Sequence, residues 1–156
     1  MVPARTQRPV VRRNVLAFAR DLLGAFRVVV LNGPRQSGKS TLLRQLHSGR
    51  GGTGGTFANL DDEAQFQAAR ADPESFVLSD HPFAYIDEFQ RGGDALVRAV
   101  KARVDSPNNT TTTFVLAGSS NFLTMPTVAE SLAGRAVFVE VWPFSQGERL
   151  GIEERF

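Results

Sequence analysis

Short, almost wholly apolar runs alternate along the chain with stretches in which apolar residues recur every three or four positions. The short runs are typical of strands buried on both faces of a sheet, and the periodic stretches are typical of helices that cover it. The predicted strands are 26–32, 56–60, 83–86, 114–117 and 136–141. This alternation predicts an α/β fold, a three-layer sandwich with a mainly parallel, five-stranded sheet.

The periodic stretches predict helices over 10–24, 39–47, 94–104 and 128–133, with further helical turns after the acids at 61–63 and after Pro73. Gly24 is expected to cap the first helix, because glycine readily adopts the left-handed conformation that ends many helices. The glycine-rich residues 48–55 predict a flexible loop with nothing to pack, and residues 1–9 predict a disordered or extended tail. The core is expected to take up Phe18, Phe26, Phe57, Phe66, Phe76 and Phe114.

A phosphate-binding pattern lies between the first strand and the helix that follows it. Gly33 to Ser40 read G-P-R-Q-S-G-K-S and match G-x-x-x-x-G-K-[ST] at every position, in the strand–loop–helix context that distinguishes a real P-loop from a chance match. Glycines let successive N–H groups converge on phosphate oxygens, and the helix start adds the positive end of its dipole. The residues expected to hold a nucleoside triphosphate are Gly33, Pro34, Arg35, Gln36, Ser37, Gly38, Lys39, Ser40 and Thr41.

Four of the candidate residues carry the chemistry of a triphosphate and Mg²⁺. Lys39 should reach the β- and γ-phosphates, and the Ser40 hydroxyl should take one position on Mg²⁺. Asp87 ends a buried strand, where a carboxylate is costly without a cation, and should hold the metal through water. Glu88 would then polarise the attacking water as general base. The plainer alternative is a strand that reaches the surface at two acids.

Further polar residues should gather near the phosphates, because ligands of such sheets bind beyond the carboxyl ends of the strands. The loop near 59–61 and the pair Ser119-Ser120 belong there. Ser119 could hydrogen-bond the attacking water or the γ-phosphate, or could be a turn residue. Arg135 could neutralise transition-state charge in its own chain or on a neighbouring subunit, or could be a surface residue. The segment 8–13 is one candidate support for adenine.

Composition narrows the class of protein. The 156 residues, 42% hydrophobic and 22% charged, describe an ordinary soluble domain, and no apolar run approaches the roughly 20 residues that span a bilayer. The lack of cysteine excludes disulfides and thiolate metal sites and fits a cytoplasmic protein.

An arginine-rich segment, 1–27, could contact nucleic acid or an acidic partner. No nucleic-acid-binding motif accompanies it, and a solvated helix face with a tail is the plainer alternative.

Several ordered motifs resemble a known family: G-P-R-Q-S-G-K-S-T-L-L, Y-I-D-E-F-Q, F-V-L-A-G-S-S-N, S-L-A-G-R-A and V-W-P-F-S. Over residues 8–150 the chain is similar to the AAA+-type ATPase domain of a prokaryotic P-loop family, whose members usually carry a C-terminal nuclease-like domain. The resemblance implies a Walker A motif at 33–40, a Walker B motif at Asp87-Glu88, a sensor at Ser119 or Ser120 and a sensing or finger-like role for Arg135. It implies an ATPase core over 10–150, with 151–156 beginning the C-terminal region that in relatives continues into a lid.

These residues support a Mg²⁺-dependent ATPase that hydrolyses the β–γ bond of ATP, with ATP and ADP as ligands and a second copy or another protein as partner. The alternative is a nucleotide-binding regulatory or interaction module with little or no hydrolysis, which the early end of the sequence favours and Glu88 argues against. A third hypothesis is a small P-loop kinase. Such kinases usually need a mobile, arginine-rich lid, whereas residues 125–134 contain no arginine.

Overall fold

The computed structural model describes residues 13–49, 51–108, 112–119, 121 and 124–151. Within these residues five strands form one sheet in the order β2-β3-β4-β1-β5, and all four pairings are parallel. The predicted α/β sheet is therefore confirmed. The strands are β1 (Val28–Gly33), β2 (Thr56–Asn59), β3 (Phe83–Asp87), β4 (Thr113–Ser119) and β5 (Ala136–Glu140).

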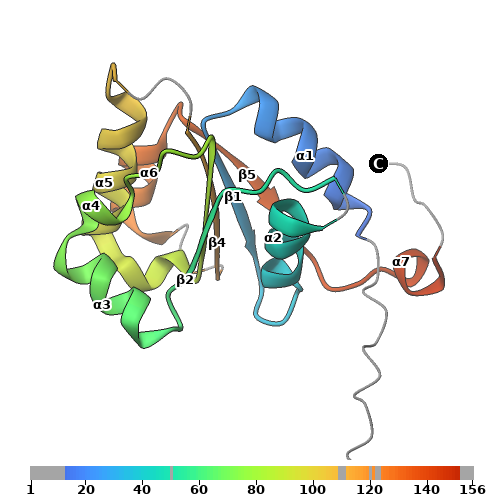
Figure 1. Ribbon diagram of the computed structural model, residues 1–156. Coiled ribbons are helices and arrows are strands. Elements are labelled where there is room, and N and C mark those ends of the chain that lie inside the picture. Colours follow the sequence, from blue (N-terminus) through green and yellow to red (C-terminus); the bar gives the residue numbers. More distant parts are fainter. Residues whose placement is uncertain (1–12, 50, 109–111, 120, 122–123, 152–156) are drawn as a thin grey trace, which may run out of the picture.

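Helices cover both faces of the sheet, which gives the expected three layers (Figure 1). On one face lie α1 (Val15–Ala25) and α2 (Lys39–Ser48). The other face carries α3 (Glu63–Ala71), α4 (Pro73–Phe76), α5 (Gly93–Asp105) and α6 (Pro126–Leu132). Two elements were not predicted from the sequence, the 3-10 helix η1 (Phe89–Gly92) and the short helix α7 (Gln146–Leu150), which stands apart from the sheet.

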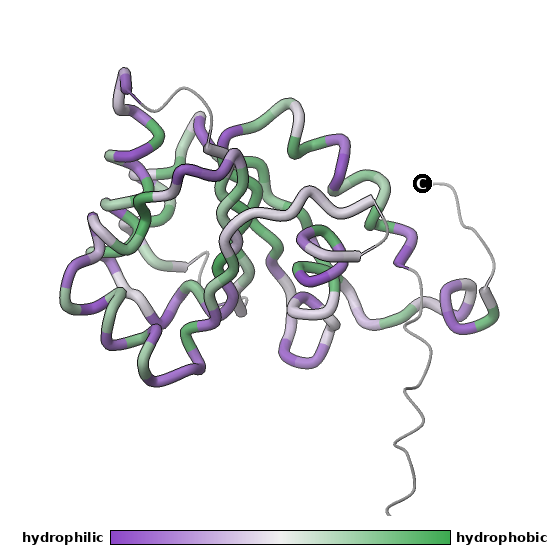
Figure 2. Tube along the Cα trace, viewed as in Figure 1, coloured by the Kyte–Doolittle hydropathy of each residue, from purple (hydrophilic) through white to green (hydrophobic). Residues whose placement is uncertain are grey.

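Successive side chains of β1 pack alternately into the two halves of the core. Val28 and Val30 pack with the α3–α6 layer, and Val29 and Leu31 pack with α1 and α2. Because successive side chains of a strand point to opposite faces, a strand buried on both faces reads as the continuous apolar run seen in the sequence. Figure 2 shows the hydrophobic residues gathered along the strands and the polar ones on the outer faces of the helices.

Three predictions were wrong for the first helix and the residue that follows it, those for Gly24, Phe18 and Phe26. The helix runs through Gly24 to Ala25, and Phe26 follows in an extended conformation, so Gly24 does not cap it. Phe18 is 56% exposed and Phe26 is 41% exposed. The buried stripe of α1 consists of Leu16, Ala19 and Leu23, and Phe18 lies outside it. Phe114 is fully buried, as expected.

The glycine-rich loop after α2 has packing partners, contrary to expectation. The Thr53 hydroxyl lies 2.5 Å from the Tyr85 hydroxyl, and the carbonyl of Gly55 lies 3.0 Å from Nε2 of His47. The His47 ring contacts both Tyr85 and Phe57. Backbone N–H groups of Thr53 and Gly54 also donate to the end of α2. The loop therefore closes over an aromatic cluster at the edge of the sheet.

The alkaline titration of Tyr85, the chain's single tyrosine, should report on this cluster. Burial raises the pKa of Tyr85 above its ordinary value of 10.0, and the bond from Thr53 opposes the shift. We expect the phenolate absorbance of the folded protein to appear at a higher pH than that of the urea-unfolded protein. Because the folded pKa is the higher one, this residue's contribution to stability is present below pH 10 and is lost as pH rises through the folded pKa.

Thr53→Val provides the matched comparison, since it removes the bond that favours the phenolate. It should move the Tyr85 midpoint further up. Superimposable titrations of the folded and unfolded wild type would show that Tyr85 is not buried as described.

Candidate functional site

The carboxyl ends of the parallel strands bring the candidate residues to one edge of the sheet. Gly33 at the end of β1 pairs with Ser119 at the end of β4, and Asn59 at the end of β2 pairs with Asp87 at the end of β3. The P-loop, the acids Asp87 and Glu88, Ser119 and the loop after β2 thus share this edge, as the parallel pairing requires. Ser120, the other sensor candidate, lies outside the described residues.

The backbone of the P-loop curls through left-handed conformations. Gln36 has φ 61° and Gly38 has φ 89°, on either side of Ser37. A non-glycine residue in this region costs about 1–3 kcal/mol, and such strain concentrates at ligand sites. Alternating left- and right-handed residues turn successive N–H groups towards one concavity, which suits an anion. Gly38 is also the N-terminal boundary of α2, so the helix dipole points at the same place.

Gly33 packs directly against the chain that follows β5. A Cβ atom on Gly33 would lie 2.2 Å from the carbonyl oxygen of Val141, and the N–H of Val141 donates to the carbonyl of Asn32 at 2.6 Å. No side chain fits this space, since the obstacle is backbone. The glycine is therefore needed for close packing as well as for the turn.

Gly33→Ala should lower the free energy of unfolding by about 1–3 kcal/mol, the usual range for overpacking, and should weaken nucleotide binding because the loop must shift. Gly24→Ala is the matched control. It lies in α1 with nothing within 4 Å of the added carbon, and should stabilise by roughly 0.5–1 kcal/mol. Urea unfolding of both variants measures the difference. Equal stabilities would contradict the contact with Val141.

Lys39 lies across the P-loop and is only 8% exposed. Its ammonium donates to the carbonyls of Gly33 at 2.9 Å and Pro34 at 2.6 Å. Burial lowers the pKa of Lys39 below its ordinary value, and the carboxylates of Glu88 and Asp87 partly offset this effect. Lys39 of the P-loop and the two acids after β3 are therefore close enough to influence one another electrostatically.

The acids after β3 have distinct surroundings. Asp87 is buried, 3% exposed, and its Oδ1 accepts the N–H of Glu88 at 3.0 Å. Glu88 has φ 52° and turns the chain from β3 into η1. Its carboxylate accepts a hydrogen bond from Nε2 of Gln90 at 2.5 Å. Gln90 was not recognised as a site residue from the sequence, although it ends the Y-I-D-E-F-Q motif, and here it orients the proposed general base.

The donor set suits Mg²⁺ rather than a metal held in an all-protein cage. Among the described residues no three His, Asp or Glu side chains gather as a ligand cluster. Mg²⁺ usually takes one or two carboxylates, and substrate phosphates and water complete its octahedron. Asp87, buried at the strand end, and Ser40, in the first turn of α2, are residues of the required kind.

Arg135 does not join this site. It directly precedes β5, whose first residue, Ala136, pairs with Val28 at the start of β1. Arg135 therefore lies at the amino edge of the sheet, and the P-loop lies at the carboxyl edge. Its guanidinium forms a two-point ion pair with Asp105, at 2.6 and 2.9 Å, which raises the pKa of Arg135 and lowers that of Asp105. The role within its own chain that the sequence left open is not supported, and the neighbouring-subunit and surface roles stay open.

Arg13 is a residue of the site that sequence reasoning missed as an individual. It is 4% exposed, and its Nη1 donates to the carbonyl of Ser37 in the P-loop at 2.8 Å. Its Nη2 donates to the carbonyl of Trp142, and its Nε lies 3.2 Å from a carboxylate oxygen of Glu148. The sequence analysis included Arg13 only within an arginine-rich stretch and within 8–13, a candidate support for adenine, because no local pattern indicates a contact with residues more than a hundred positions away.

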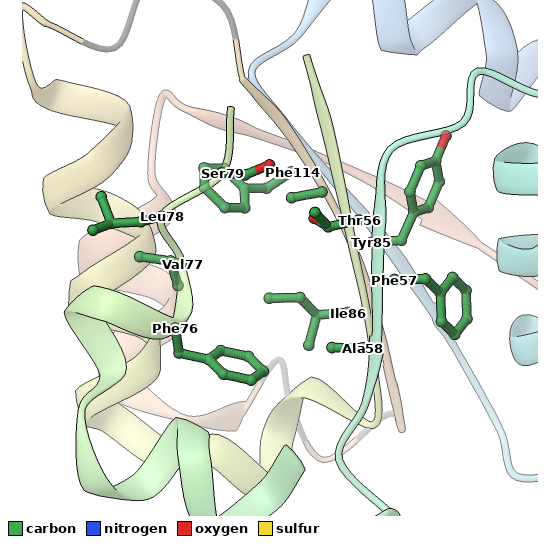
Figure 3. A pocket seen from close by; sticks show the side chains of 11 residues that line it. Thr56, Phe57, Ala58, Phe76, Val77, Leu78, Ser79, Tyr85, Ile86 and Phe114 are labelled. Carbon is green, nitrogen blue, oxygen red and sulfur yellow. The ribbon is translucent and has the colours of Figure 1, made fainter. Parts of the chain in front are cut away.

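An apolar cavity of about 100 Å³ lies elsewhere, between the sheet and the segment after α4. Figure 3 shows Val77 and Leu78 on one side and Ala58, Ile86 and Phe114 on the sheet side. No charged side chain lines it, so it cannot hold a phosphate. The carboxyl edge of the sheet therefore stays the candidate site.

This chain has a parallel sheet covered by helices, a P-loop after β1, and acids at the end of β3. These features define the class of P-loop nucleotide-binding proteins. The sequence profile of a family described as an AAA domain matches residues 25–150. The chain belongs to this family, so the expected AAA+-type ATPase domain is confirmed. Membership implies nucleotide binding and, typically, dependence on Mg²⁺.

Two curated relatives are the uncharacterized proteins Rv2008c of Mycobacterium tuberculosis and Mb2031c of Mycobacterium bovis. Each is 36% identical over 131 residues, which is 83% of this chain and 28% of the relative. The chain thus spans little more than a quarter of the length of the relatives that it matches.

Among solved structures, a DNA polymerase III gamma subunit-related protein of Thermotoga maritima matches with a TM-score of 0.52 and 12% identity, over 86% of this chain and 47% of that one. At this identity the match shows a shared fold. PCH-2 of C. elegans matches with a TM-score of 0.47 and 15% identity, over 88% of this chain and 44% of that one. None of the helices in the described part of the chain is long and apolar enough to cross a membrane.

Proposed function

We propose that this chain binds ATP with Mg²⁺ at residues 33–41 and hydrolyses the β–γ phosphate bond. The observation that carries the proposal is the buried ammonium of Lys39, held in the P-loop and influenced by both Asp87 and Glu88. A cation, a concave run of N–H groups and two carboxylates at one sheet edge are the parts that phosphoryl transfer to water requires.

Each part has a separate role in this reaction. The ammonium of Lys39, which lies among loop carbonyls, would turn to the β- and γ-phosphates and stabilise the charge that develops on them. The N–H groups around Gly38 would hold the phosphate oxygens in place. Glu88, oriented by the amide of Gln90, would accept a proton from the attacking water. Ser119, level with Gly33, would contact the water or the γ-phosphate.

The proposed metal site consists of Ser40 and Asp87. Bound there, Mg²⁺ would neutralise charge on the β- and γ-phosphate oxygens. The buried Asp87 carboxylate would gain the cationic partner that its position calls for, and the N–H of Glu88 already orients one of its oxygens.

A second candidate function is a nucleotide-binding regulatory or interaction module with little turnover. The position of Arg135 favours it, because the ion pair with Asp105 at the far edge leaves this arginine unable to act on its own chain's nucleotide. AAA+ proteins frequently form oligomers, and in a homo-oligomer Arg135 could reach the site of a neighbouring copy.

The lack of cysteine supports a reducing compartment such as the cytoplasm.

Phosphate release measured at increasing protein concentration tests the first candidate against the second. An ATPase should release phosphate with saturable dependence on ATP and a requirement for Mg²⁺, and its specific activity should rise with concentration if copies cooperate. Bound nucleotide without phosphate release at any protein concentration would decide for the module. Absence of nucleotide binding would overturn both.

A further inference from the structure

A buried ion pair connects the P-loop to the last helix described. Arg13 and Glu148 have side chains only 4% and 6% exposed, and Nε of Arg13 lies 3.2 Å from Oε1 of Glu148. The same guanidinium donates to the carbonyls of Ser37 and Trp142. Its central carbon lies 4.6 Å from the centre of the Phe144 ring. One side chain therefore contacts the P-loop, the segment after β5 and α7.

The contact with Ser37 bears directly on the orientation of the phosphate-binding backbone. The peptide between Ser37 and Gly38 is planar and trans, so its N–H points opposite to its carbonyl. Arg13 holds the carbonyl of Ser37 on its own side, and therefore turns the N–H of Gly38 away from itself. A Cβ on Gly38 would lie 3.0 Å from Nη1 of Arg13, which shows how closely the guanidinium is packed against the loop.

The contact with Glu148 ties the same guanidinium to α7. Glu148 completes a capping box with Ser145, whose N–H donates to Oε2 of Glu148 at 3.0 Å. The other oxygen, Oε1, accepts the N–H of Asn14 at 2.8 Å. One carboxylate oxygen is thus held by the backbone next to Arg13 and the other by the backbone of Ser145. Glu148 therefore joins the chain around Arg13 to the segment 142–150, which we call the C-terminal strap.

We propose that Arg13 is a positioning residue that couples occupancy of the P-loop to the position of the C-terminal strap. The inference rests on the proposed nucleotide binding and adds a regulatory output to that same site. Phosphate bound by the N–H of Gly38 polarises the Ser37–Gly38 peptide, so the carbonyl of Ser37 becomes a stronger acceptor and holds the guanidinium of Arg13 more tightly. The change reaches Trp142 through its carbonyl and α7 through Glu148.

Arginine suits this role because its planar fork contacts several acceptors at once in fixed geometry. A lysine at position 13 would keep the charge, but its donors sit on one nitrogen and would not reach the separate positions of Ser37, Trp142 and Glu148 that the three nitrogens of Arg13 reach. Arg13→Lys should therefore keep the positive charge at this position and lose the coupling.

The strap carries its own reporter, since Trp142 is the chain's single tryptophan and is 62% exposed. Titration of the full chain with Mg²⁺–ADP, and with Mg²⁺ and a slowly hydrolysed ATP analogue, should change the emission of Trp142 or its quenching by acrylamide. The change should saturate with the dissociation constant that calorimetry gives for the same nucleotide. A purely structural ion pair would leave the fluorescence unaltered by nucleotide.

Coupling is reciprocal, so weakening the strap must weaken the nucleotide site. Glu148→Gln keeps the shape of the side chain and an oxygen acceptor, and removes the charge that faces Arg13. It should fold, should lose most of the Trp142 response, and should bind nucleotide about five-fold more weakly or worse. Arg13→Lys should behave in the same way. Arg149→Gln, an exposed charge change on the same helix, is the matched control and should match the wild type.

The outcomes separate this inference from the proposed function. Nucleotide binding seen by calorimetry with no change at Trp142 in the wild type overturns the coupling and leaves the nucleotide site standing. An unaltered Trp142 response and affinity in both variants overturns the part played by Arg13 and Glu148. No heat of nucleotide binding at all overturns the proposed function, and the coupling with it.

Discussion

Lys39→Ala is expected to weaken ATP binding by at least about 100-fold, because it removes charge-assisted hydrogen bonds to two phosphates that contribute about 1.5–3 kcal/mol each. The buried ammonium lies in the P-loop, and among the described residues no other lysine is near enough to replace it. Calorimetric titration with Mg²⁺–ATP measures the loss. Circular dichroism at rising temperature shows whether the variant is still folded.

The chain contains only one other lysine, Lys101, which makes a matched control. Lys101 lies in α5, where its charge acts on Asp105 near the amino edge of the sheet. Lys101→Ala should bind Mg²⁺–ATP as the wild type does. Equal loss in both variants would point to a nonspecific effect of charge, and undiminished binding by Lys39→Ala would contradict the assignment of the P-loop.

Glu88→Gln is expected to lower the rate of phosphate release by about 100- to 10,000-fold, the usual contribution of a general base, and to leave ATP affinity within a few-fold of the wild type. Glutamine keeps the shape of the side chain and can still accept the bond from Gln90, but it cannot take a proton from water. A loss confined to turnover, with binding intact, is the signature of a group that acts in the transition state. Phosphate release under saturating ATP gives the rate.

The control for this variant is Glu130→Gln, on the exposed surface of α6. It makes the same change in charge and should leave both the rate and the affinity unchanged. If Glu88→Gln and the wild type released phosphate equally fast, Glu88 would not be the base. The nearby buried carboxylate, Asp87, would then need the same test.

The local structure that carries the candidate site could be predicted from the sequence. A P-loop consists of consecutive residues between a strand and a helix, so the pattern from Gly33 to Ser40 contains its own context. The buried strands could also be predicted from the sequence, because a parallel sheet covered on both faces requires continuous apolar runs. The common edge then followed, since in a parallel sheet the acids after β3 must lie at the same edge as the loop after β1, whereas the order and register of the strands came from the structure.

The contacts that join distant parts of the chain could not be read in this way. Arg13 contacts Trp142 across 129 positions, and only the fold brings them together. Composition alone predicts a flexible loop around Thr53. In the structure the Thr53 hydroxyl forms a hydrogen bond with the hydroxyl of Tyr85 in β3, which holds the loop in place. Arg135 is different, since its place directly before a parallel strand already implied the amino edge, and topology could have separated it from the phosphates.

Calorimetric titration of the wild-type chain with ATP in the presence of Mg²⁺ tests the central claim most directly. We predict one saturable site per chain, competed by ADP and lost when Lys39 is replaced by alanine. Absence of saturable binding by folded wild-type protein, or binding that survives Lys39→Ala unchanged, would contradict a nucleotide site at residues 33–41.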